Sequence, residues 1–366
     1  MNFKLNPLTL TAFVVLCPAL VLAQATEQQP APSWTDSIVV SGDLRLRYEG
    51  IRQEGNVDRH RGRYRARLGL DADIANNLGL VFGLASGGDD PVSTNQSFGD
   101  GFSTKDVGVD LIYVNWAPIS ELVLVGGKMP KPWFRPGGSS LIWDSDLNPE
   151  GVAASYEVQR FFANAGSFVV EESGSESETL LNTLQGGTVF DFSESSSFAA
   201  AASYYGYNNI VGKEPFFLGL AKGNTVDAEG NFVYDYKTIE LMAQYRTMVA
   251  KQPILFFGQW ARNTATGVIE DTAFAFGAAI GRASSPGSWQ LSYTFHDTGA
   301  DAVVGTFTDS DFANGNTDSR GHYIRGRYRV VDHVNLGGTL ILSEFGEFAG
   351  NKVDYDRIMI DLMFDF

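Results

Sequence analysis

The sequence predicts an all-β fold, namely a transmembrane up-and-down antiparallel β-barrel of sixteen strands with short periplasmic turns and long external loops. Three observations predict this fold. Apolar and polar residues alternate along many segments, so the two sets lie on opposite faces of strands. Short and long connections alternate between the segments, as in bacterial barrels in which one rim carries only tight turns. The number of segments is even, which brings both ends of such a barrel to the same side.

The N-terminal segment has the features of a cleaved export signal. Lys4 precedes an apolar run over residues 8–22, and small residues at 23 and 25 allow cleavage after Ala25. An N-terminal membrane anchor is the alternative, but about 20 apolar residues are needed to span a bilayer. We therefore predict a signal peptide over 1–25, a periplasmic leader over 26–36 and the barrel over 37–366.

The overall charge and hydropathy narrow the class of protein. The formal net charge is −16, whereas proteins that bind nucleic acid present clustered cations to the phosphates, so we expect no nucleic-acid partner. No segment after the signal peptide has about 18 uncharged apolar residues, so we expect no transmembrane helix.

Alternation identifies the strands one by one. In the final segment Ile358 and Ile360 share one face and Arg357 and Asp361 share the other, whereas an α-helix would mix them. Fourteen or eighteen strands stay open as alternatives, because apolar and polar residues alternate poorly in the middle of the chain. A soluble β-sandwich is the alternative fold. The clear segments are 38–50, 62–74, 78–86, 107–117, 121–129, 236–248, 288–297, 321–331, 334–344 and 353–366. The weaker segments are 151–159, 161–172, 180–190, 197–207, 253–263 and 272–283.

Arginine recurs at every second position in the stretches DLRLRYE, GRYRARL and YIRGRYRV. On a barrel strand, apolar residues such as Leu44 and Leu68 face lipid, and the residues that alternate with them face the lumen. Because the first and last strands pair to close the barrel, the arginines fall on one wall. We predict a pore-lining basic wall formed by Arg45, Arg47, Arg63, Arg65, Arg67, Arg325, Arg327, Arg329 and Arg357.

These arginines have two interpretations. Neighbouring acids, such as Asp43, Glu49, Asp71 and Asp361, can pair with them, in which case the charges are structural. Alternatively, the wall orders water and discriminates solutes by charge and dipole. The two interpretations overlap, because a paired arginine still shapes the electric field of the lumen.

The connection over residues 130–150 is too rich in apolar and aromatic residues for a solvated loop, so we expect it to pack against something. If it folds into the barrel, its acids can face the arginine wall and create a transverse field. An outward loop that packs on its neighbours is the alternative. The predicted residues of this constriction loop are Trp133, Arg135, Asp144, Asp146 and Glu150.

The stretches SGDLRLRYEG, KMPKPWFRP and LIWDSDLNPEGVA resemble the putative porin family of Gram-negative outer membranes. The resemblance spans residues from about 37 to 366 and is most specific over 128–153. It implies a general diffusion or weakly selective porin of sixteen strands, a homotrimer, and a third external loop that folds inward. Residues 130–150 form the third external connection of the predicted barrel. The resemblance names no solute.

Other chemistry finds little support in the sequence. The four histidines, at 60, 296, 322 and 333, have no recognisable serine or aspartate context, so we expect no catalytic residues and no enzyme activity. No cofactor motif is present, and we expect no cofactor. The acidic stretches 224–235 and 309–318 lack the spacing of a calcium loop, so we expect solvated loops rather than metal sites.

Together these observations predict an outer-membrane porin that lets small hydrophilic solutes and ions diffuse passively through a water-filled pore. Its expected partners are outer-membrane lipid and lipopolysaccharide. Two alternatives stay open. The arginine wall favours a substrate-selective channel for anions such as phosphate or carboxylates, and the long loops favour a closed barrel that acts as an adhesin or scaffold.

Overall fold

The computed structural model describes residues 37–174 and 177–366. The predicted signal peptide and leader lie outside the described residues. In chain order the strands are β1 (Ile38–Gln53), β2 (Arg59–Ala75), β3 (Leu78–Ser86), β4 (Gln96–Ser97), β5 (Val107–Ile119), β6 (Leu122–Lys128), β7 (Glu150–Val158), β8 (Phe161–Glu171), β9 (Thr179–Ser193), β10 (Ser196–Asn208), β11 (Lys237–Val249), β12 (Gln252–Asn263), β13 (Thr272–Gly281), β14 (Trp289–Thr298), β15 (Ser319–Val331), β16 (Val334–Phe345) and β17 (Val353–Asp365).

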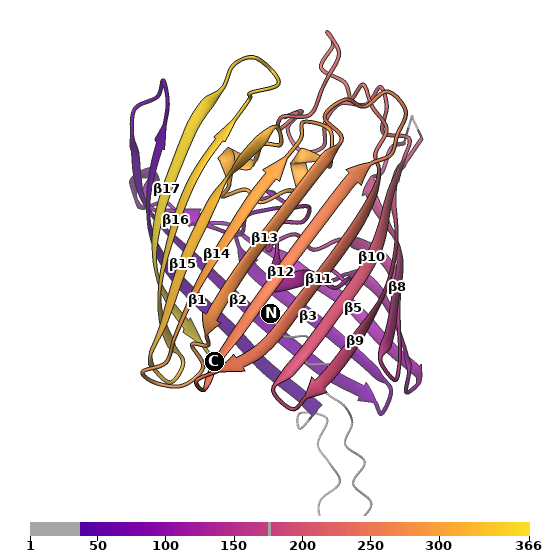
Figure 1. Ribbon diagram of the computed structural model, residues 1–366, viewed down its shortest axis with the longest axis vertical. Coiled ribbons are helices and arrows are strands. Elements are labelled where there is room, and N and C mark those ends of the chain that lie inside the picture. The colour runs from indigo at the N-terminus through magenta and orange to yellow at the C-terminus, as the bar shows by residue number, and fades with distance from the viewer. Residues whose placement is uncertain (1–36, 175–176) are drawn as a thin grey trace, which may run out of the picture.

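The strands form one closed barrel (Figure 1). β4 is a two-residue strand in an external loop, and the other sixteen strands pair antiparallel with their neighbours around the barrel. β17 pairs with β1 from Asp43–Asp365 to Gln53–Tyr355, which closes the sheet. The predicted sixteen-stranded barrel is therefore confirmed, and the poorly phased segments over 151–207 form β7 to β10.

The two faces of the sheet have opposite chemistry. On β1, the side chains of Leu44 and Leu46 are 38% and 39% exposed on the outer face, whereas those of Arg47 and Glu49 face the lumen and are 7% and 0% exposed. Side chains that alternate along a strand must point to opposite faces. The ionic residues therefore lie inside the barrel and the apolar residues form its outer surface.

Connections at the two rims differ in length, as predicted. At one rim the turns are short: residues 76–77, 120–121, 159–160, 194–195, 250–251, 282–288 and 332–333. Ala250 and Lys251 both have positive φ angles, of 48° and 65°, which a tight two-residue hairpin requires. Four connections at the opposite rim are long, and we name them L2 (87–106), L3 (129–149), L5 (209–236) and L7 (299–318).

The hydrophobic core lies within the barrel, where L3, L5 and L7 pack on the inner face of the wall. Phe307 of L7 stacks on Phe216 of L5 with ring centroids 5.8 Å apart, and Trp143 of L3 lies 6.4 Å from Phe307. Figure 1 shows L7 within the outline of the barrel, between the strands that it connects. In the described part of the chain, no helix is long and apolar enough to cross a membrane.

The orientation of the wall predicts the effect of a charge on either face. Leu46→Arg places a guanidinium in the apolar outer surface near the middle of β1, and should lower the free energy of unfolding in lipid vesicles by about 2–4 kcal/mol. Ser155→Arg, on the lumen side of β7, should lower it much less. Urea unfolding of both variants measures the difference. Equal losses would contradict the assignment of the two faces.

Candidate functional site

The nine predicted arginines lie on β1, β2, β15 and β17, which form one contiguous part of the wall together with β16. Their positions follow from the two-residue period of each strand and from the pairing of β17 with β1. Asp43, Glu49 and Asp361 pair with some of these arginines, as the structural interpretation proposed, whereas Asp71 makes no ion pair with the described residues. We call this part of the inner wall, with its arginines, the arginine wall.

A buried glutamate lies in the part of the arginine wall that is nearer to the long loops. The Glu49 side chain has no exposed surface, and its carboxylate lies 2.5 Å from Arg61, 3.5 Å from Arg63 and 2.7 Å from Arg357. A buried charge needs such partners, because desolvation without them is costly. Three strands, β1, β2 and β17, are thereby joined by one carboxylate.

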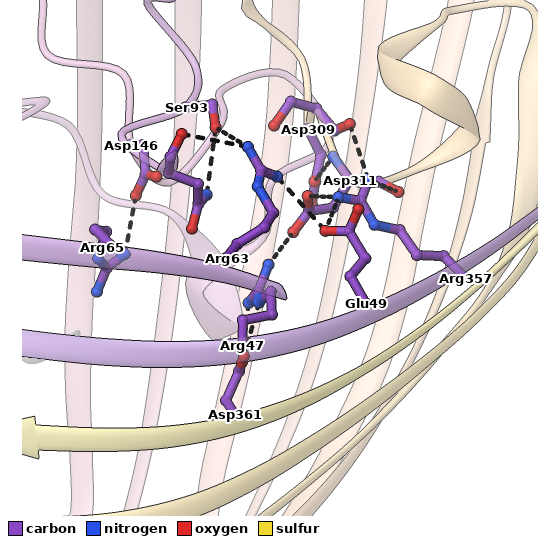
Figure 2. A network of polar contacts seen from close by, with 12 residues as sticks. Arg47, Glu49, Arg63, Arg65, Ser93, Asp146, Asp309, Asp311, Arg357 and Asp361 are labelled. Carbon is purple, nitrogen blue, oxygen red and sulfur yellow. Dashed lines mark hydrogen bonds and ion pairs between the residues drawn. The ribbon is translucent and has the colours of Figure 1, made fainter. Parts of the chain in front are cut away.

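Arg47 and Arg357 also hold an aspartate from an external loop (Figure 2). Arg47 binds Asp361 in a bidentate manner, with N–O distances of 2.7 and 2.9 Å. Asp311 of L7 completes the arrangement: one of its carboxylate oxygens lies 3.1 Å from Arg47 and the other 2.8 Å from Arg357. L7 is therefore attached to the arginine wall through two charge-assisted contacts.

A second cluster of ion pairs lies on β1 and β2, nearer to the rim with the short turns. Asp43 pairs with Arg65 at 2.8 Å and with Arg67 at 2.7 Å. Asp146 of L3 approaches the same two arginines, at 3.4 Å and 3.9 Å. A predicted acid of L3 thus lies against the arginine wall.

The remaining predicted arginines differ in their partners. Arg329 pairs with Asp365 at 2.8 Å, and Arg325 lies 3.8 Å from Asp309. Arg45 donates to the neutral amide oxygen of Asn95 at 2.6 Å and has no carboxylate partner among the described residues. Arg327 is exposed to the lumen and makes neither a hydrogen bond through its side chain nor an ion pair with the described part of the chain.

L3 enters the lumen between β6 and β7 and reaches β11 with its tip. Trp133, only 1% exposed, packs against Trp143 and against Tyr205 of β10, with ring centroids 5.1 and 5.6 Å away. At the tip of L3, the Gly137 N–H donates to Gln244 of β11 at 3.0 Å. A side chain at position 137 would lie 2.4 Å from the Phe257 ring, and the φ angle there is +59°, so this close approach requires glycine.

The polar residues of L3 have separate partners. Arg135 donates to the carbonyl oxygen of Trp143 at 3.1 Å and so holds the loop to itself. Asp144 accepts from the Ser310 N–H of L7 at 2.8 Å, and Glu150, at the start of β7, pairs with Lys128 at 2.7 Å. Of the three acids that we expected to face the arginines, only Asp146 therefore does so.

L7 departs from the sequence prediction. We expected residues 309–318 to form a solvated acidic loop, which is wrong: the Asp309 and Asp311 side chains are only 12% and 24% exposed, and both lie beside wall arginines. Val303, Val304 and Phe307 of the same loop are apolar and pack in the core. The criterion that identified L3, an apolar composition, would have found L7 as well.

L2 also contributes to the site. Its tip, around Ser93 to Asn95, lies between the other two loops: the Thr94 hydroxyl donates to Asp146 of L3 at 3.4 Å, and Ser310 of L7 donates to the Val92 carbonyl at 3.0 Å. Arg63 donates to Ser93 and to the Asn95 carbonyl, both at 3.4 Å. Three external loops therefore meet on the arginine wall.

The acids of these loops have opposite electrostatic environments. Burial disfavours the charged form of Asp311, but Arg357 and Arg47 outweigh it and hold the pKa of Asp311 well below its ordinary value. Burial raises the pKa of Asp144 well above its ordinary value, and the charges of Asp309 and Asp146 add to this effect. Asp311 is therefore the ionised partner of the arginines, whereas Asp144 favours its proton.

Lys131 holds the part of L3 that carries Asp146. Its ammonium donates to the carbonyl oxygens of Ser145 and Leu147, on either side of Asp146. Burial lowers the pKa of Lys131 to about 7, with a further contribution from Arg135. Within 37–174 and 177–366, no group of three or more histidine, cysteine, aspartate or glutamate side chains has a geometry that could hold a metal ion.

Solved structures share this architecture at low sequence identity. OprB of Pseudomonas putida aligns over 90% of this chain and 94% of its own, with a TM-score of 0.61 and 10% identity. OmpF of Salmonella typhi covers 91% and 99% of the two chains, with a TM-score of 0.56 and 10% identity. OmpT of Vibrio cholerae in its trimer form covers 90% and 100%, with a TM-score of 0.54 and 13% identity. No curated protein sequence matches the chain.

A closed barrel with an apolar outer face and an ionic lumen is the architecture of an outer-membrane channel protein. Residues 51–229 and 224–366 match the family described as "Putative porin", and the chain belongs to this family. The family agrees with the resemblance that the sequence motifs indicated.

Removal of the Asp311 charge should release L7. In Asp311→Asn the contacts to Arg47 and Arg357 lose their ionic character, whereas these arginines keep Asp361 and Glu49, so the barrel should remain closed. We expect L7 docking to weaken by about 1–3 kcal/mol and chymotrypsin to cleave faster after Phe312. Asp332→Asn, in a short turn at the opposite rim, is the matched control. Unchanged cleavage in Asp311→Asn would contradict the attachment.

The contact between L3 and L7 should depend on pH through Asp144. Its pKa is higher in the folded protein than in the unfolded chain, so its proton stabilises the folded state below about pH 4, and this contribution is lost as the pH rises through the raised pKa. Hydrogen-exchange protection of the Ser310 N–H should therefore fall between acidic and alkaline pH. Asp144→Asn should remove this dependence. Protection that increases with pH would be the opposite of our expectation.

Proposed function

We propose that this protein is an outer-membrane porin through which small hydrophilic solutes and ions diffuse passively. The observation that carries the proposal is the course of L3 through the lumen: from β6 and β7 its tip reaches Gln244 of β11, and its Asp146 lies within 3.4 Å of Arg65 on β2. A loop across an ionic lumen leaves a narrow polar passage, which limits solutes by size and orients them by charge. Transport of this kind involves no catalysis, and we assign no catalytic residue and no cofactor.

The residues that we propose to line the narrow part are the arginine wall together with the acids of two loops. Asp146 and Asp311 lie on the loop side, and Arg47, Arg65 and Arg357 on the wall side. Because these acids and arginines are in ionic contact, solutes would pass beside the pairs, whose dipoles produce a local field in a medium of low dielectric constant. A dipolar solute would align with this field, and an apolar solute would have to displace ordered water.

The cellular context follows from the family and from the N-terminal sequence. We propose export by cleavage of the signal peptide after Ala25 and insertion among outer-membrane lipid and lipopolysaccharide. We also propose a homotrimer, by analogy with the trimer form described for OmpT of Vibrio cholerae. Chemical cross-linking of the detergent-solubilised protein, followed by mass determination, tests the number of subunits.

A second candidate function is selective passage of anions. It is favoured by Arg45 and Arg327, which have no ion-pair partner in the described residues and so leave uncompensated positive charge in the lumen. The reversal potential of the purified protein in a salt gradient across a planar bilayer separates the two candidates. A general porin gives a potential near zero, whereas an anion channel gives one close to the chloride equilibrium potential.

Liposome swelling tests the third possibility, a closed barrel that acts as an adhesin or scaffold. Proteoliposomes containing a porin swell in isotonic sugar at a rate that falls with the size of the sugar. A sealed barrel produces no swelling with any sugar, and this outcome would overturn the proposed function.

Shortening two acids of L3 should widen the passage. Asp144→Ala with Asp146→Ala removes the side-chain contacts of these acids to Ser310 of L7 and to Arg65, whereas the Asp144 N–H still donates to Phe307 of L7, so the part of L3 around residue 146 can withdraw from the arginine wall. We expect faster swelling with trisaccharides and little change with pentoses. Glu150→Ala is the matched control, because this acid directly follows L3 at the start of β7 and pairs with Lys128. An unchanged size dependence in the double variant would contradict the role of L3.

A further inference from the structure

A patch of inward-facing polar side chains without partners lies on β14, β15 and β16, beside the arginine wall. The side chains of Gln290 and Ser292 on β14, Arg327 on β15 and Thr339 on β16 make no hydrogen bond to any described residue. We call these four residues the open patch. By contrast, the carboxylates of the neighbouring strands are engaged, for example Asp361 by Arg47 at 2.7 Å.

The strand register brings the open patch together. Gln290 lies opposite Arg327, and Ser292 lies opposite Arg325, which in turn lies opposite Thr339. Side chains directly opposite one another on antiparallel strands have Cβ atoms about 4.5–5.5 Å apart. The residue beside Arg327 on β16 is Gly337, and the Met363 methyl group of β17 lies 3.1 Å from the position that a Cβ atom would take there. The Gln290 amide is therefore the direct neighbour of Arg327, whereas the hydroxyls of Ser292 and Thr339 lie on either side of Arg325, about 10 Å apart, so a solute that reaches all four groups must extend across three strands.

The charges around the open patch indicate the charge of its ligand. On β15, Arg325 lies near Asp309 at 3.8 Å and Arg329 pairs with Asp365 at 2.8 Å. Arg327 lies between them with no carboxylate of its own, and its side chain is exposed. The local excess is thus one positive charge, which matches a monoanion. A guanidinium presents parallel N–H groups that fit the two oxygens of a carboxylate.

We propose that the open patch binds a small hydroxylated carboxylate, with the carboxylate on Arg327 and solute hydroxyls on Ser292, Thr339 and Gln290. The unpartnered hydroxyls and amide can each donate and accept, as a polyol requires. A bound group of this class would replace the water that otherwise solvates these side chains. The proposal rests on the proposed function, because the solute must enter the lumen.

The experiment measures block of the chloride current through single channels in planar bilayers. The added solutes are D-gluconate, which is both charged and hydroxylated, butyrate, which is only charged, and sorbitol, which is only hydroxylated. We expect the half-blocking concentration of gluconate to be about tenfold below that of the other two. Relative to sorbitol, gluconate adds a charge-assisted hydrogen bond to Arg327, and relative to butyrate it adds hydroxyl hydrogen bonds that contribute about 1 kcal/mol each. Equal half-blocking concentrations for gluconate and butyrate in the wild type would overturn the proposal.

Variants separate the two halves of the patch. Arg327→Gln should raise the half-blocking concentration of gluconate about tenfold. Ser292→Ala with Thr339→Val should raise it severalfold and leave butyrate unchanged, and this variant retains every charge of the wall. The absence of a gluconate effect in both variants would overturn the proposal.

Arg246→Gln is the matched control. Arg246 is an exposed, lumen-facing arginine of β11, and it likewise makes no side-chain hydrogen bond or ion pair with the described residues. Its removal should leave gluconate block unchanged. An effect equal to that of Arg327→Gln would assign the block to the overall positive field and overturn the site. A wild-type protein that carries no current at all would instead refute the proposed function.

Discussion

Backbone hydrogen bonding is the constraint on which the rest of this structure depends. Within a bilayer every amide and carbonyl needs a partner inside the protein, and a sheet meets this need only when its edges join. The pairing of β1 with β17 joins them. It also places Arg47 beside Asp361 and Glu49 beside Arg357, although the members of these pairs are 314 and 308 positions apart in sequence. Closure therefore builds the arginine wall as well as the barrel.

A strand was predictable from the sequence where its outer face meets lipid and its inner face meets a polar lumen. β1, β2 and β17 face lipid on one side and ions on the other, so their alternation is plain in the sequence. β7 to β10 were harder to phase, because their inner faces are covered by loops instead of water. Ala153, Phe168, Leu181 and Tyr205 point inward into the core, which leaves apolar residues on both faces of these strands.

The candidate site was only partly predictable. The arginines follow from periodicity alone, since each belongs to a strand whose faces the sequence defines. The partners of the loop acids do not follow from periodicity. Asp144 and Asp146 are separated by one residue, yet Asp144 binds L7 and Asp146 binds the wall. That difference depends on the turn held by Lys131, and no short-range pattern specifies it. The contacts of Asp311 were not predicted, although the apolar residues before it, Val303, Val304 and Phe307, indicate a packed loop as those of L3 do.

L3 is attached to the wall at widely separated points around the circumference. It begins and ends at β6 and β7, contacts β11 through Gly137, and reaches β2 through Asp146. A loop fastened across a hollow cylinder acts as an internal strut, which resists flattening of the cross-section under lateral pressure from the lipids. The same segment that restricts the bore can thus preserve its round shape.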